Sequence, residues 1–229
     1  MPKHGKRYLA AAEQRDREQE YPLAEAIALV KKMATAKFDE TIEMHFRLGI
    51  DPRQAEEQIR TTVMLPNGLG KSVTVLVFAE GEDARAAEEA GADIIADDAI
   101  IAQIQNEGWT EFDAAIAVPS MMPKVGRLGR VLGPRSLMPT PKAGTVVQPS
   151  DLPRAIQELK SGRIEIRNDR TGNVHFPIGK ASFDEQALLG NAQMALDVVK
   201  GHKPSGMKGI YMRRFVVVST MGPGIKVSS

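Results

Sequence analysis

The strand patterns of this chain change twice along its length, and this change constrains the fold more than any other feature. Residues 41–51 alternate apolar and polar side chains, which is the period-two pattern of a strand with one face in water. Residues 71–79 instead form a nearly continuous apolar run, typical of a strand that is covered on both faces. The alternating pattern returns after Gly162. We therefore expect two different kinds of sheet in one chain of 229 residues.

The middle of the chain predicts an α/β, Rossmann-like domain. Short apolar segments alternate there with helical patterns in the order strand, helix, strand, helix, strand. This spacing predicts a small parallel sheet with helices on its faces. Ser150 is the expected cap of a further helix that follows. The expected strands are 71–79, 93–96 and 113–119, and the expected helices are 82–91, 98–108 and 150–162.

The head and the tail of the chain predict an α+β domain, with an antiparallel sheet and helices. An amphipathic helix is expected to begin with Pro22 in its first turn. Strands 163–168 and 173–179 are expected to form a hairpin across the turn Asp169–Gly172. The remaining expected elements are the helices 22–34 and 184–201 and the strands 59–65 and 210–220.

We expect the head and the tail to form one discontinuous domain, residues 1–67 plus 160–229, with residues 68–159 inserted into it. Insertion is tolerated where chain ends lie close together. Two consecutive domains are the alternative, which is less favoured because the head alone has too few strands for a sheet core. The crossings fall near Pro66–Gly70 and Lys160–Gly162, and two glycine-containing strands suit a hinge.

Charge is distributed unevenly along the chain, although the net total is only +1. Residues 1–67 carry 11 Lys/Arg and 11 Asp/Glu, residues 68–159 carry 8 and 13, and residues 160–229 carry 11 and 5. The inserted segment is therefore acidic, with a net charge of −5, and the tail is basic, with a net charge of +6. This asymmetry suggests a polyanionic partner for part of the chain. Chance scatter is the alternative, because no single basic run is long.

Composition excludes several classes of protein. The chain has no cysteine, which excludes disulfides, thiolate metal sites and thiol catalysis. No apolar run approaches the roughly 20 residues that span a bilayer, so no membrane partner is expected. The N-terminal residues are charged and lack the apolar core of a secretory signal. We therefore expect a cytoplasmic protein.

Motifs for nucleotide binding and catalysis fail on their spacing. The GLGKS sequence at 68–72 is similar to a phosphate loop, but Leu65 stands where that motif needs its first glycine. Gly126, Gly129 and Gly133 do not have the dinucleotide spacing either. The four histidines lack metal-ligand spacing, and no nucleophile motif is present. We expect no enzyme, metal, cofactor or small-molecule substrate; the alternative is a nucleotide-using enzyme built on the inserted sheet.

Residues 126–145, the basic loop, combine four glycines and three prolines with positive charge and no acid. Glycine and proline at this density predict an irregular loop and exclude a regular helix or central strand. The loop is expected to contact tRNA or rRNA phosphate, or to act as a structural cap on the inserted sheet. Its basic residues, with one that lies just before it, are Lys124, Arg127, Arg130, Arg135 and Lys142.

Features suited to RNA lie in the head and the tail. Phe38 stands among charges just before the wet-faced strand, where an exposed ring stacks on a base; the alternative is that it tucks under the neighbouring helix. The hairpin tip and two small flexible loops offer donors to phosphates and 2′-hydroxyls, and Arg213 and Arg214 offer further phosphate contacts. The RNA-binding candidates are Lys37, Phe38, Glu40, Thr41, Arg167, Asn168, Asp169, Thr171, Lys180, Ser182, Thr220, Met221 and Gly222.

A series of segments in one order resembles the family of the bacterial large-subunit ribosomal protein L-one, the protein of the mobile stalk beside the tRNA exit site. The segments run from MPKHGKRY through ATAKFDET, LGID, LPNGLGK, LGRVLGPR, MPTPKAGTV, GRIEIRND and GKASF to TMGPG. Ser136 and Thr140 depart from the resemblance, because they stand where glycine and asparagine are usual. Both lie in the basic loop, so they bear on the turn geometry there.

The resemblance implies a two-domain fold with the second domain inserted, and it implies partners. The first domain would bind the stalk region of large-subunit rRNA, and stalk movement would help to release deacylated tRNA from the exit site. The chain would also repress translation of its own operon by binding its mRNA. The RNA contacts implied by the resemblance are Lys37–Thr41, Asn168–Thr171, Lys180–Ser182 and Thr220–Gly222.

We therefore expect a non-enzymatic ribosomal protein. Readout of RNA shape and 2′-hydroxyls by the first domain is expected to give specificity. Basic residues are expected to give salt-dependent affinity.

Overall fold

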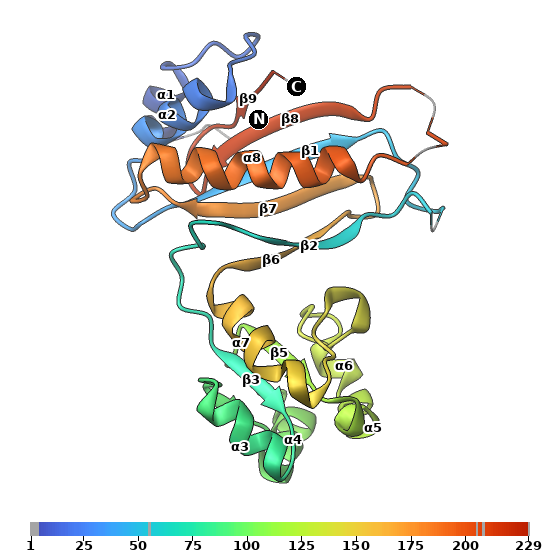
Figure 1. Cartoon of the computed structure of the whole chain (residues 1–229). Helices are drawn as coiled ribbons and strands as arrows, with labels where there is room; N and C mark the ends of the chain where they lie inside the picture. The colour runs from blue at the N-terminus through green and yellow to red at the C-terminus, as the bar shows by residue number, and fades with distance from the viewer. Residues whose placement is uncertain (1–4, 55, 205, 208, 229) are drawn as a thin grey trace. The chain divides into compact units, whose positions relative to one another are not determined.

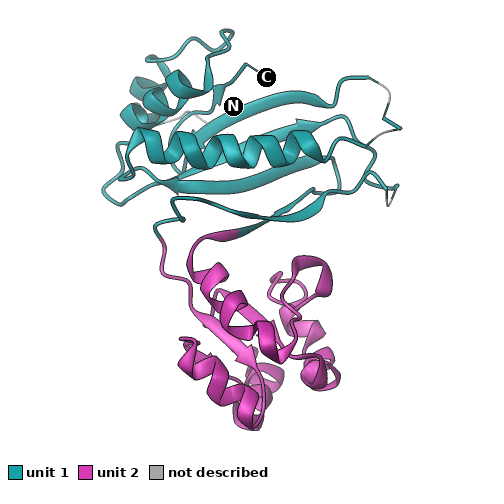
Figure 2. Ribbon diagram, in the orientation of Figure 1, with its two compact units in different colours: residues 1–70, 164–229 teal, residues 71–163 magenta. Residues whose placement is uncertain are grey.

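The chain divides into two compact units. Residues 1–70 with 164–229 form unit 1, and residues 71–163 form unit 2 (Figure 2). These divisions fall a few residues beyond the expected domain boundaries, and the role of each unit stays a prediction. The computed structural model describes residues 5–54, 56–204, 206–207 and 209–228.

Unit 1 is built around a four-stranded sheet in which neighbouring strands are antiparallel. β1 lies inside the sheet, with Thr41 opposite Lys180 on one side and Ile42 opposite Ser219 on the other. The antiparallel sheet predicted from the alternating strands is confirmed. In spatial order the strands are β7 Asn173–Lys180, β1 Thr41–Leu48, β8 Met212–Ser219 and β9 Ile225–Lys226 (Figure 1).

One face of this sheet forms the core of unit 1. The helices that cover it are α2 Leu23–Met33 and α8 Glu185–Gly201 (Figure 1). Phe46 of β1 stacks between Phe176 and Phe215, with ring centroids 5.7 and 4.4 Å away. Full burial of such a side chain contributes roughly 1.5–3 kcal/mol, so this triplet anchors three strands to one core. The buried side chains of β1 are Ile42, Met44, Phe46 and Leu48.

The expected hairpin is wrong beyond its turn at Asp169–Gly172. β6 Arg163–Arg167 pairs with β2 Arg60–Met64 in a separate two-stranded sheet, whereas β7 pairs with β1. The cause lies at Asn168, whose side-chain Oδ1 accepts from Ile59 N at 2.8 Å while its own N donates to Ile59 O at 3.2 Å. Asn168 therefore couples the end of β6 to a segment far away in the sequence.

The first crossing between the units, residues 66–70, is held within unit 1 by the buried side chain of Asn191 on α8. Asn191 Oδ1 accepts from Asn67 N at 3.0 Å. Its Nδ2 donates to Gly68 O at 2.9 Å and to Ile178 O at 2.8 Å. These bonds satisfy the buried amide and join the crossing to β7.

Unit 2 contains a three-stranded parallel sheet in the order β4-β3-β5, which confirms the predicted small parallel sheet. All residues of β3 are buried, as expected of a strand covered on both faces. Leu76 and Phe78 belong to one core cluster, and Val75 and Val77 belong to another. The main elements are the strands β3 Val75–Phe78, β4 Ile94–Ile95 and β5 Ala114–Ala117 and the helices α3 Glu82–Glu89, α4 Asp98–Glu107 and α7 Leu152–Lys160.

The expectation of an irregular basic loop at 126–145 is wrong in part. Leu128 and Leu132 are fully buried in the core of unit 2. Their burial outweighs the helix-propensity cost of glycine, which is about 1 kcal/mol per residue. The regular elements within or beside the loop are α5 Met122–Gly126, α6 Gly129–Leu132 and the 3-10 turn η2 Pro141–Ala143.

Ser150 does not cap helix α7, contrary to expectation. It lies inside the 3-10 turn η3 Pro149–Asp151, and Asp151, which precedes the helix, makes no side-chain cap bond. No described helix is both long enough and apolar enough to cross a membrane. The described elements that no sequence pattern predicted include α1 Lys6–Ala12, η1 Pro119–Met121 and β9.

Candidate nucleic-acid interface

Most of the RNA-binding candidates meet at the end of the sheet where β1 begins. The sheet register brings Thr41 opposite Lys180, and the chain turns at 220–222 immediately after β8. Segments 37–41 and 180–182 therefore share one end of the sheet with that turn. We call this group the sheet-end cluster, and its candidates are Lys37, Phe38, Glu40, Thr41, Lys180, Ser182, Thr220, Met221 and Gly222.

Hydrogen bonds fasten the three segments of the sheet-end cluster to one another. Thr41 N donates to Thr220 Oγ1 at 2.9 Å, and Thr220 N donates to Thr41 O at 3.0 Å. Lys180 Nζ donates to Thr41 Oγ1 at 2.9 Å. Ser182 donates to the Asp39 carboxylate from its backbone N at 3.0 Å and from its hydroxyl at 2.6 Å. The hydroxyl bond is the main reason that the pKa of Asp39 is lowered.

Glu40 does not present its carboxylate to solvent, and its expected role as an RNA contact stays a prediction. Its residue exposure is 1%. The carboxylate accepts from Ala36 N at 2.8 Å and from Met221 N at 2.9 Å. Burial is the largest influence and raises the pKa of Glu40, but the two backbone donors contribute to a net lowering. Glu40 is therefore a positioning residue that joins the loop before β1 to the turn after β8.

Two large apolar side chains of the sheet-end cluster face solvent. Phe38 is 54% exposed and Met221 is 49% exposed. This decides between the alternatives for Phe38 in favour of the exposed ring. The neighbouring turn is tight, because a Cβ on Gly222 would lie 2.5 Å from the hydroxyl oxygen of Ser219. Glycine at this position therefore avoids a clash within the turn.

The candidates at the hairpin tip lie at the other end of the sheet. The strand pairing there joins Arg47 to Asn173. Thr41 lies six residues from Arg47 along β1, a separation of roughly 20 Å at about 3.4 Å per residue. The structure therefore separates the candidates into two groups. The tip group is Arg167, Asn168, Asp169 and Thr171.

Asp169 organises the hairpin tip. Its carboxylate accepts from Thr171 N at 2.8 Å and from the Thr171 hydroxyl at 2.9 Å. It also accepts from Asn173 N at 2.8 Å and from Asn173 Nδ2 at 3.0 Å. Burial raises the pKa of Asp169, but these donors outweigh it and lower the pKa to about 2. The polar atoms of the tip therefore hold the turn in one shape.

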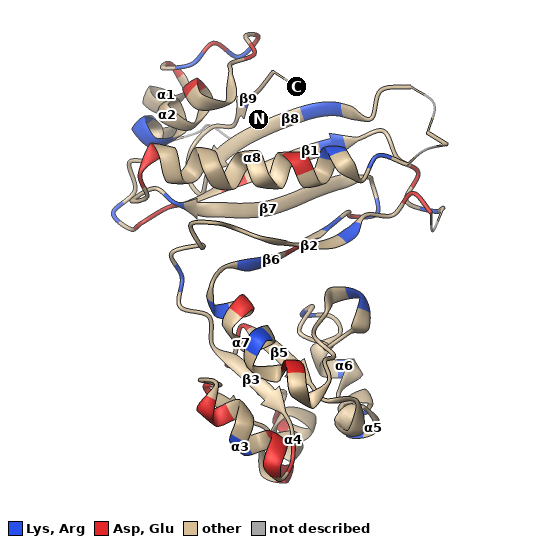
Figure 3. Ribbon diagram, in the orientation of Figure 1, with Lys and Arg blue, Asp and Glu red and all other residues tan. Residues whose placement is uncertain are grey.

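The exposed face of the sheet connects the two ends, and of its charged side chains the sequence analysis named Arg214 but not Glu43, His45 or Arg47. Glu43, His45 and Arg47 alternate with the buried residues of β1. His45 lies opposite His175 of β7, and Arg47 lies opposite Arg214 of β8. The alternation of apolar and polar residues in 41–48 was the sequence signal for this face, because it places these charged side chains on the same side of the strand. Figure 3 shows the basic residues on β1 and β8.

Comparisons with known proteins identify the family of the chain. The sequence pattern of the Ribosomal protein L1p/L10e family matches residues 30–223. The chain belongs to this family. The protein "Large ribosomal subunit protein uL1" of Chloroflexus aggregans is 59% identical over 227 residues, covering 99% of this chain and 96% of that protein. The protein of the same name from Thermosipho melanesiensis is 52% identical over 228 residues, covering 100% and 97%.

Membership of the L1p/L10e family identifies a ribosomal protein and confirms that the chain is not an enzyme. The alternative of a nucleotide-using enzyme is therefore rejected. Among the described residues, no group of three or more His, Cys, Asp or Glu side chains is placed to hold a metal ion.

The two departures from the family pattern occupy defined positions in the basic loop of this L1p/L10e member. Ser136 has φ of 58°, the left-handed conformation that glycine adopts without strain. Its N donates to Gly133 O at 3.1 Å, and Leu137 N donates to Leu132 O at 3.0 Å, which is the pattern of a helix-ending Schellman turn. Thr140 Oγ1 accepts from Ala143 N at 3.3 Å, a capping bond that asparagine would also make.

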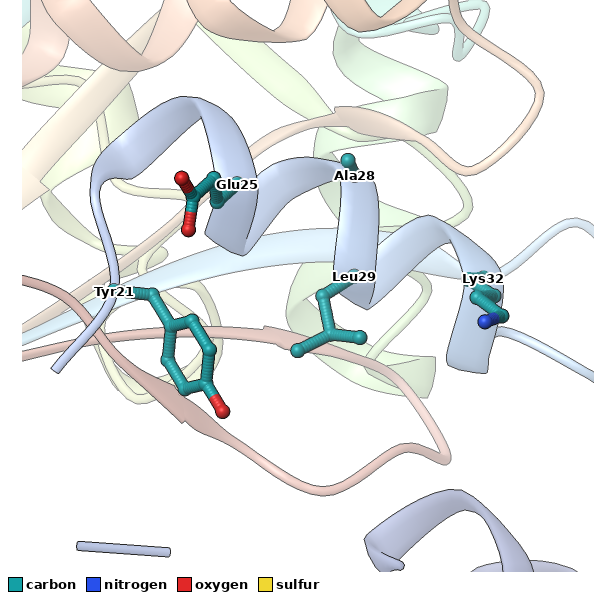
Figure 4. A pocket seen from close by; sticks show the side chains of 5 residues that line it. All are labelled: Tyr21, Glu25, Ala28, Leu29 and Lys32. Carbon is teal, nitrogen blue, oxygen red and sulfur yellow. The ribbon is translucent and has the colours of Figure 1, made fainter. Parts of the chain in front are cut away.

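Unit 1 also has a hollow of about 330 Å³ beside α2 (Figure 4). None of the RNA-binding candidates lines it. Its walls are mainly apolar, with one carboxylate and one ammonium group at the rim. The lining residues are Tyr21, Glu25, Ala28, Leu29 and Lys32.

Proposed function

We propose that the chain is a component of the large ribosomal subunit and binds large-subunit rRNA through unit 1. The observation that carries this proposal is the sheet-end cluster, where exposed Phe38 and Met221 lie among hydrogen-bonded loops. Large apolar side chains that are exposed within one cluster are a candidate contact surface for a partner. Family membership and relatives named as large-subunit proteins support rRNA as that partner.

The sheet-end cluster suits a folded RNA with unstacked bases. The ring of Phe38 offers a stacking surface for a base or a sugar, and Met221 offers an adaptable apolar contact beside it. Lys37 offers a cation, while the Thr41 and Ser182 hydroxyls are held by protein partners. Glu40 keeps the loop and the turn in register, so that the RNA does not have to order them on binding.

Electrostatics supports the same surface. Residues 160–229, most of which belong to unit 1, contain 11 Lys/Arg and 5 Asp/Glu, which gives a net charge of +6. Arg47 and Arg214 face each other across the exposed sheet, where like charges would repel without an anion between them. We expect phosphate contacts at these residues, with an affinity that falls as salt rises.

The finer roles are proposals that rest on the family resemblance. They are that unit 1 binds the stalk region of the rRNA, that the chain helps to release deacylated tRNA from the exit site, and that it represses its own operon by binding the mRNA with the same surface. Unit 2 is proposed to be a Rossmann-like insertion joined by a two-stranded hinge. Gly70 with φ of 67° and Gly162 with φ of 106° lie at the two crossings and support the hinge.

The test is the affinity of the full chain for a transcript of the stalk region of large-subunit rRNA, compared with an unrelated duplex of equal length. We expect Phe38→Ala and Met221→Ala each to weaken binding by roughly 1–3 kcal/mol, the scale of one stacking contact. Met194→Ala is a matched control, because Met194 lies on α8 and is 45% exposed.

The proposal fails if the chain binds both RNAs equally, or if the control variant loses as much affinity as Met221→Ala. Competition between the rRNA transcript and a transcript of the operon leader tests the shared surface. If the chain binds both transcripts at the same time, a single surface for the two RNAs is excluded.

A further inference from the structure

Two histidines are in direct contact on the exposed face of the sheet. Strand pairing places His45 of β1 opposite His175 of β7. Their Nδ1 atoms lie 2.7 Å apart, with ring centroids 4.9 Å apart and planes inclined by 60°. Two ring nitrogens at this distance need one proton between them, because one must donate while the other accepts. The histidines are therefore a hydrogen-bonded pair.

A carboxylate stands at each end of this pair. His45 Nε2 lies 3.5 Å from Glu43 Oε2, and His175 Nε2 lies 4.0 Å from Asp169 Oδ2. The four side chains form a continuous row from β1 to the hairpin tip. In this row each outer ring nitrogen faces a negative charge, which favours a proton there.

The geometry limits how many protons the intact pair can take. In the neutral pair, one ring carries its proton on Nδ1 and the other carries it on Nε2. A first added proton goes to the vacant Nε2, faces a carboxylate and leaves the inner hydrogen bond in place. A second proton would put hydrogens on both Nδ1 atoms at 2.7 Å and break the pair. The intact pair therefore has room for one added proton.

No further described acid lies beside the pair along its own strands, and the remaining neighbours are apolar, amide or cationic side chains. Val216 of β8 lies opposite His45, and Pro177 and Asn173 flank His175 along β7. One pleat along the sheet, Arg47 lies opposite Arg214. Burial, the largest influence, lowers the pKa of His45, His175 adds to this effect, and Glu43 opposes it.

No described carboxylate lies within 4 Å of either Arg47 or Arg214. The two guanidinium groups and the histidine pair thus share one exposed strip, and a phosphate bound to the arginines would add negative charge beside the rings. Such a charge favours the protonated pair, and by linkage the protonated pair favours the phosphate.

We propose that His45 and His175 form a one-proton site on the exposed sheet face, and that an RNA phosphate bound beside Arg47 and Arg214 is accompanied by uptake of one proton. This inference rests on the proposed rRNA binding by unit 1. The affinity for RNA increases as pH falls, by at most about tenfold per pH unit for one linked proton.

The experiment measures binding of the full chain to the stalk-region transcript from pH 8 to pH 5.5 at constant ionic strength with EDTA present. Calorimetry in two buffers of different ionisation enthalpy counts the protons taken up. We expect uptake that approaches one proton near pH 6, and little uptake in the double variant His45→Gln/His175→Gln. His202→Gln is the control, because this histidine bonds Val198 O on α8, away from the exposed sheet face, and should leave proton uptake unchanged.

Unchanged proton uptake in the double variant would overturn the proposal, because RNA bases or other groups would then supply it. Absence of specific binding at any pH would instead contradict the proposed function. NMR titration of the histidine rings in the unsubstituted protein gives an independent answer without a variant. We expect the two rings to share one added proton while the Nδ1–Nδ1 contact persists, and uptake of one full proton by each ring with that contact intact would contradict the pair.

Discussion

From the sequence, both the sheet-end cluster of unit 1 and the basic loop of unit 2 are expected to contact RNA, but they are built in opposite ways. In the cluster a buried carboxylate, Glu40, holds the backbone, and Phe38 and Met221 remain in solvent. In the basic loop the apolar side chains Leu128 and Leu132 are buried, and the arginines remain outside. The difference teaches that segments with polar and glycine residues can either expose their apolar side chains on a fixed backbone or bury them in a core, and that positive charge alone does not separate the two cases.

Replacement of Glu40 is expected to have the largest effect on stability and RNA affinity. Glu40→Ala leaves the N–H groups of Ala36 and Met221 without their buried acceptor. We expect a loss of about 3 kcal/mol in unfolding free energy, because a bond to a charged acceptor contributes about 1.5–3 kcal/mol. RNA affinity should fall as well, because the loop and the turn lose their register. Chemical denaturation and transcript binding measure the two effects.

Glu40→Gln is the graded control, because its amide oxygen still accepts one of the two bonds. We expect roughly half of the loss seen with alanine. If Glu40→Ala left RNA binding unchanged while the fold remained intact, the cluster would not depend on its buried carboxylate.

The same residue makes a prediction about acid. The pKa of Glu40 is lowered in the folded protein, so its stabilising contribution is fully present above the ordinary glutamate pKa of about 4.3. This contribution is lost as pH falls through the lowered folded value. We expect the difference in unfolding free energy between the natural protein and Glu40→Gln to shrink from pH 6 to pH 3. If this difference in unfolding free energy grew on acidification, the predicted direction would be wrong.

A substitution at Ser136, in the basic loop of unit 2, is expected to change stability less than Glu40→Ala does. Its φ of 58° strains a side chain with a Cβ, and glycine removes that strain. We expect Ser136→Gly to stabilise unit 2 by up to about 1 kcal/mol without changing affinity for the stalk transcript. Thermal unfolding tests the first part, and Gly108→Ala, at another residue with positive φ, should destabilise unit 2.

The smallest effect is expected from the charges of the basic loop. Arg127 and Arg130 are exposed on unit 2. We expect Arg127→Gln with Arg130→Gln to change affinity for the stalk transcript by less than about 0.5 kcal/mol at physiological salt, because unit 1 carries the proposed site. Arg47→Gln with Arg214→Gln is the matched pair on unit 1, and it should lower the salt dependence of binding. Equal losses from both pairs would move part of the rRNA site to unit 2.

Much of the fold was predictable because burial repeats with a local period. The alternation of apolar and polar residues around Phe46 indicated the antiparallel sheet. The continuous apolar run at 75–78 indicated the parallel sheet. The hairpin prediction failed because Asn168 bonds Ile59, a partner that no local pattern reveals. The helices of the basic loop were missed because burial of Leu132 outweighs local propensity.

The sequence indicated which segments form the candidate site, but it did not indicate what each side chain does there. A carboxylate in a charged run such as Asp39–Glu40 usually lies on a solvated surface. Glu40 is nevertheless buried, and it accepts hydrogen bonds from Ala36 N and Met221 N, which lie far apart in the sequence. The contact between His45 and His175 also depends on strand register, which brings together residues 130 positions apart. Pairings of this kind are set by tertiary structure.

The buried Asn191 determines how mechanical load would travel through unit 1. A pull on the chain at Lys71 reaches the crossing first, where two backbone groups are bonded to the Asn191 side chain. The force then enters the middle of α8 and, through the bond to Ile178, the strand β7. A pull through this crossing would therefore load a helix and a strand together, whereas a pull through the second crossing would load β6 and its partner strand β2.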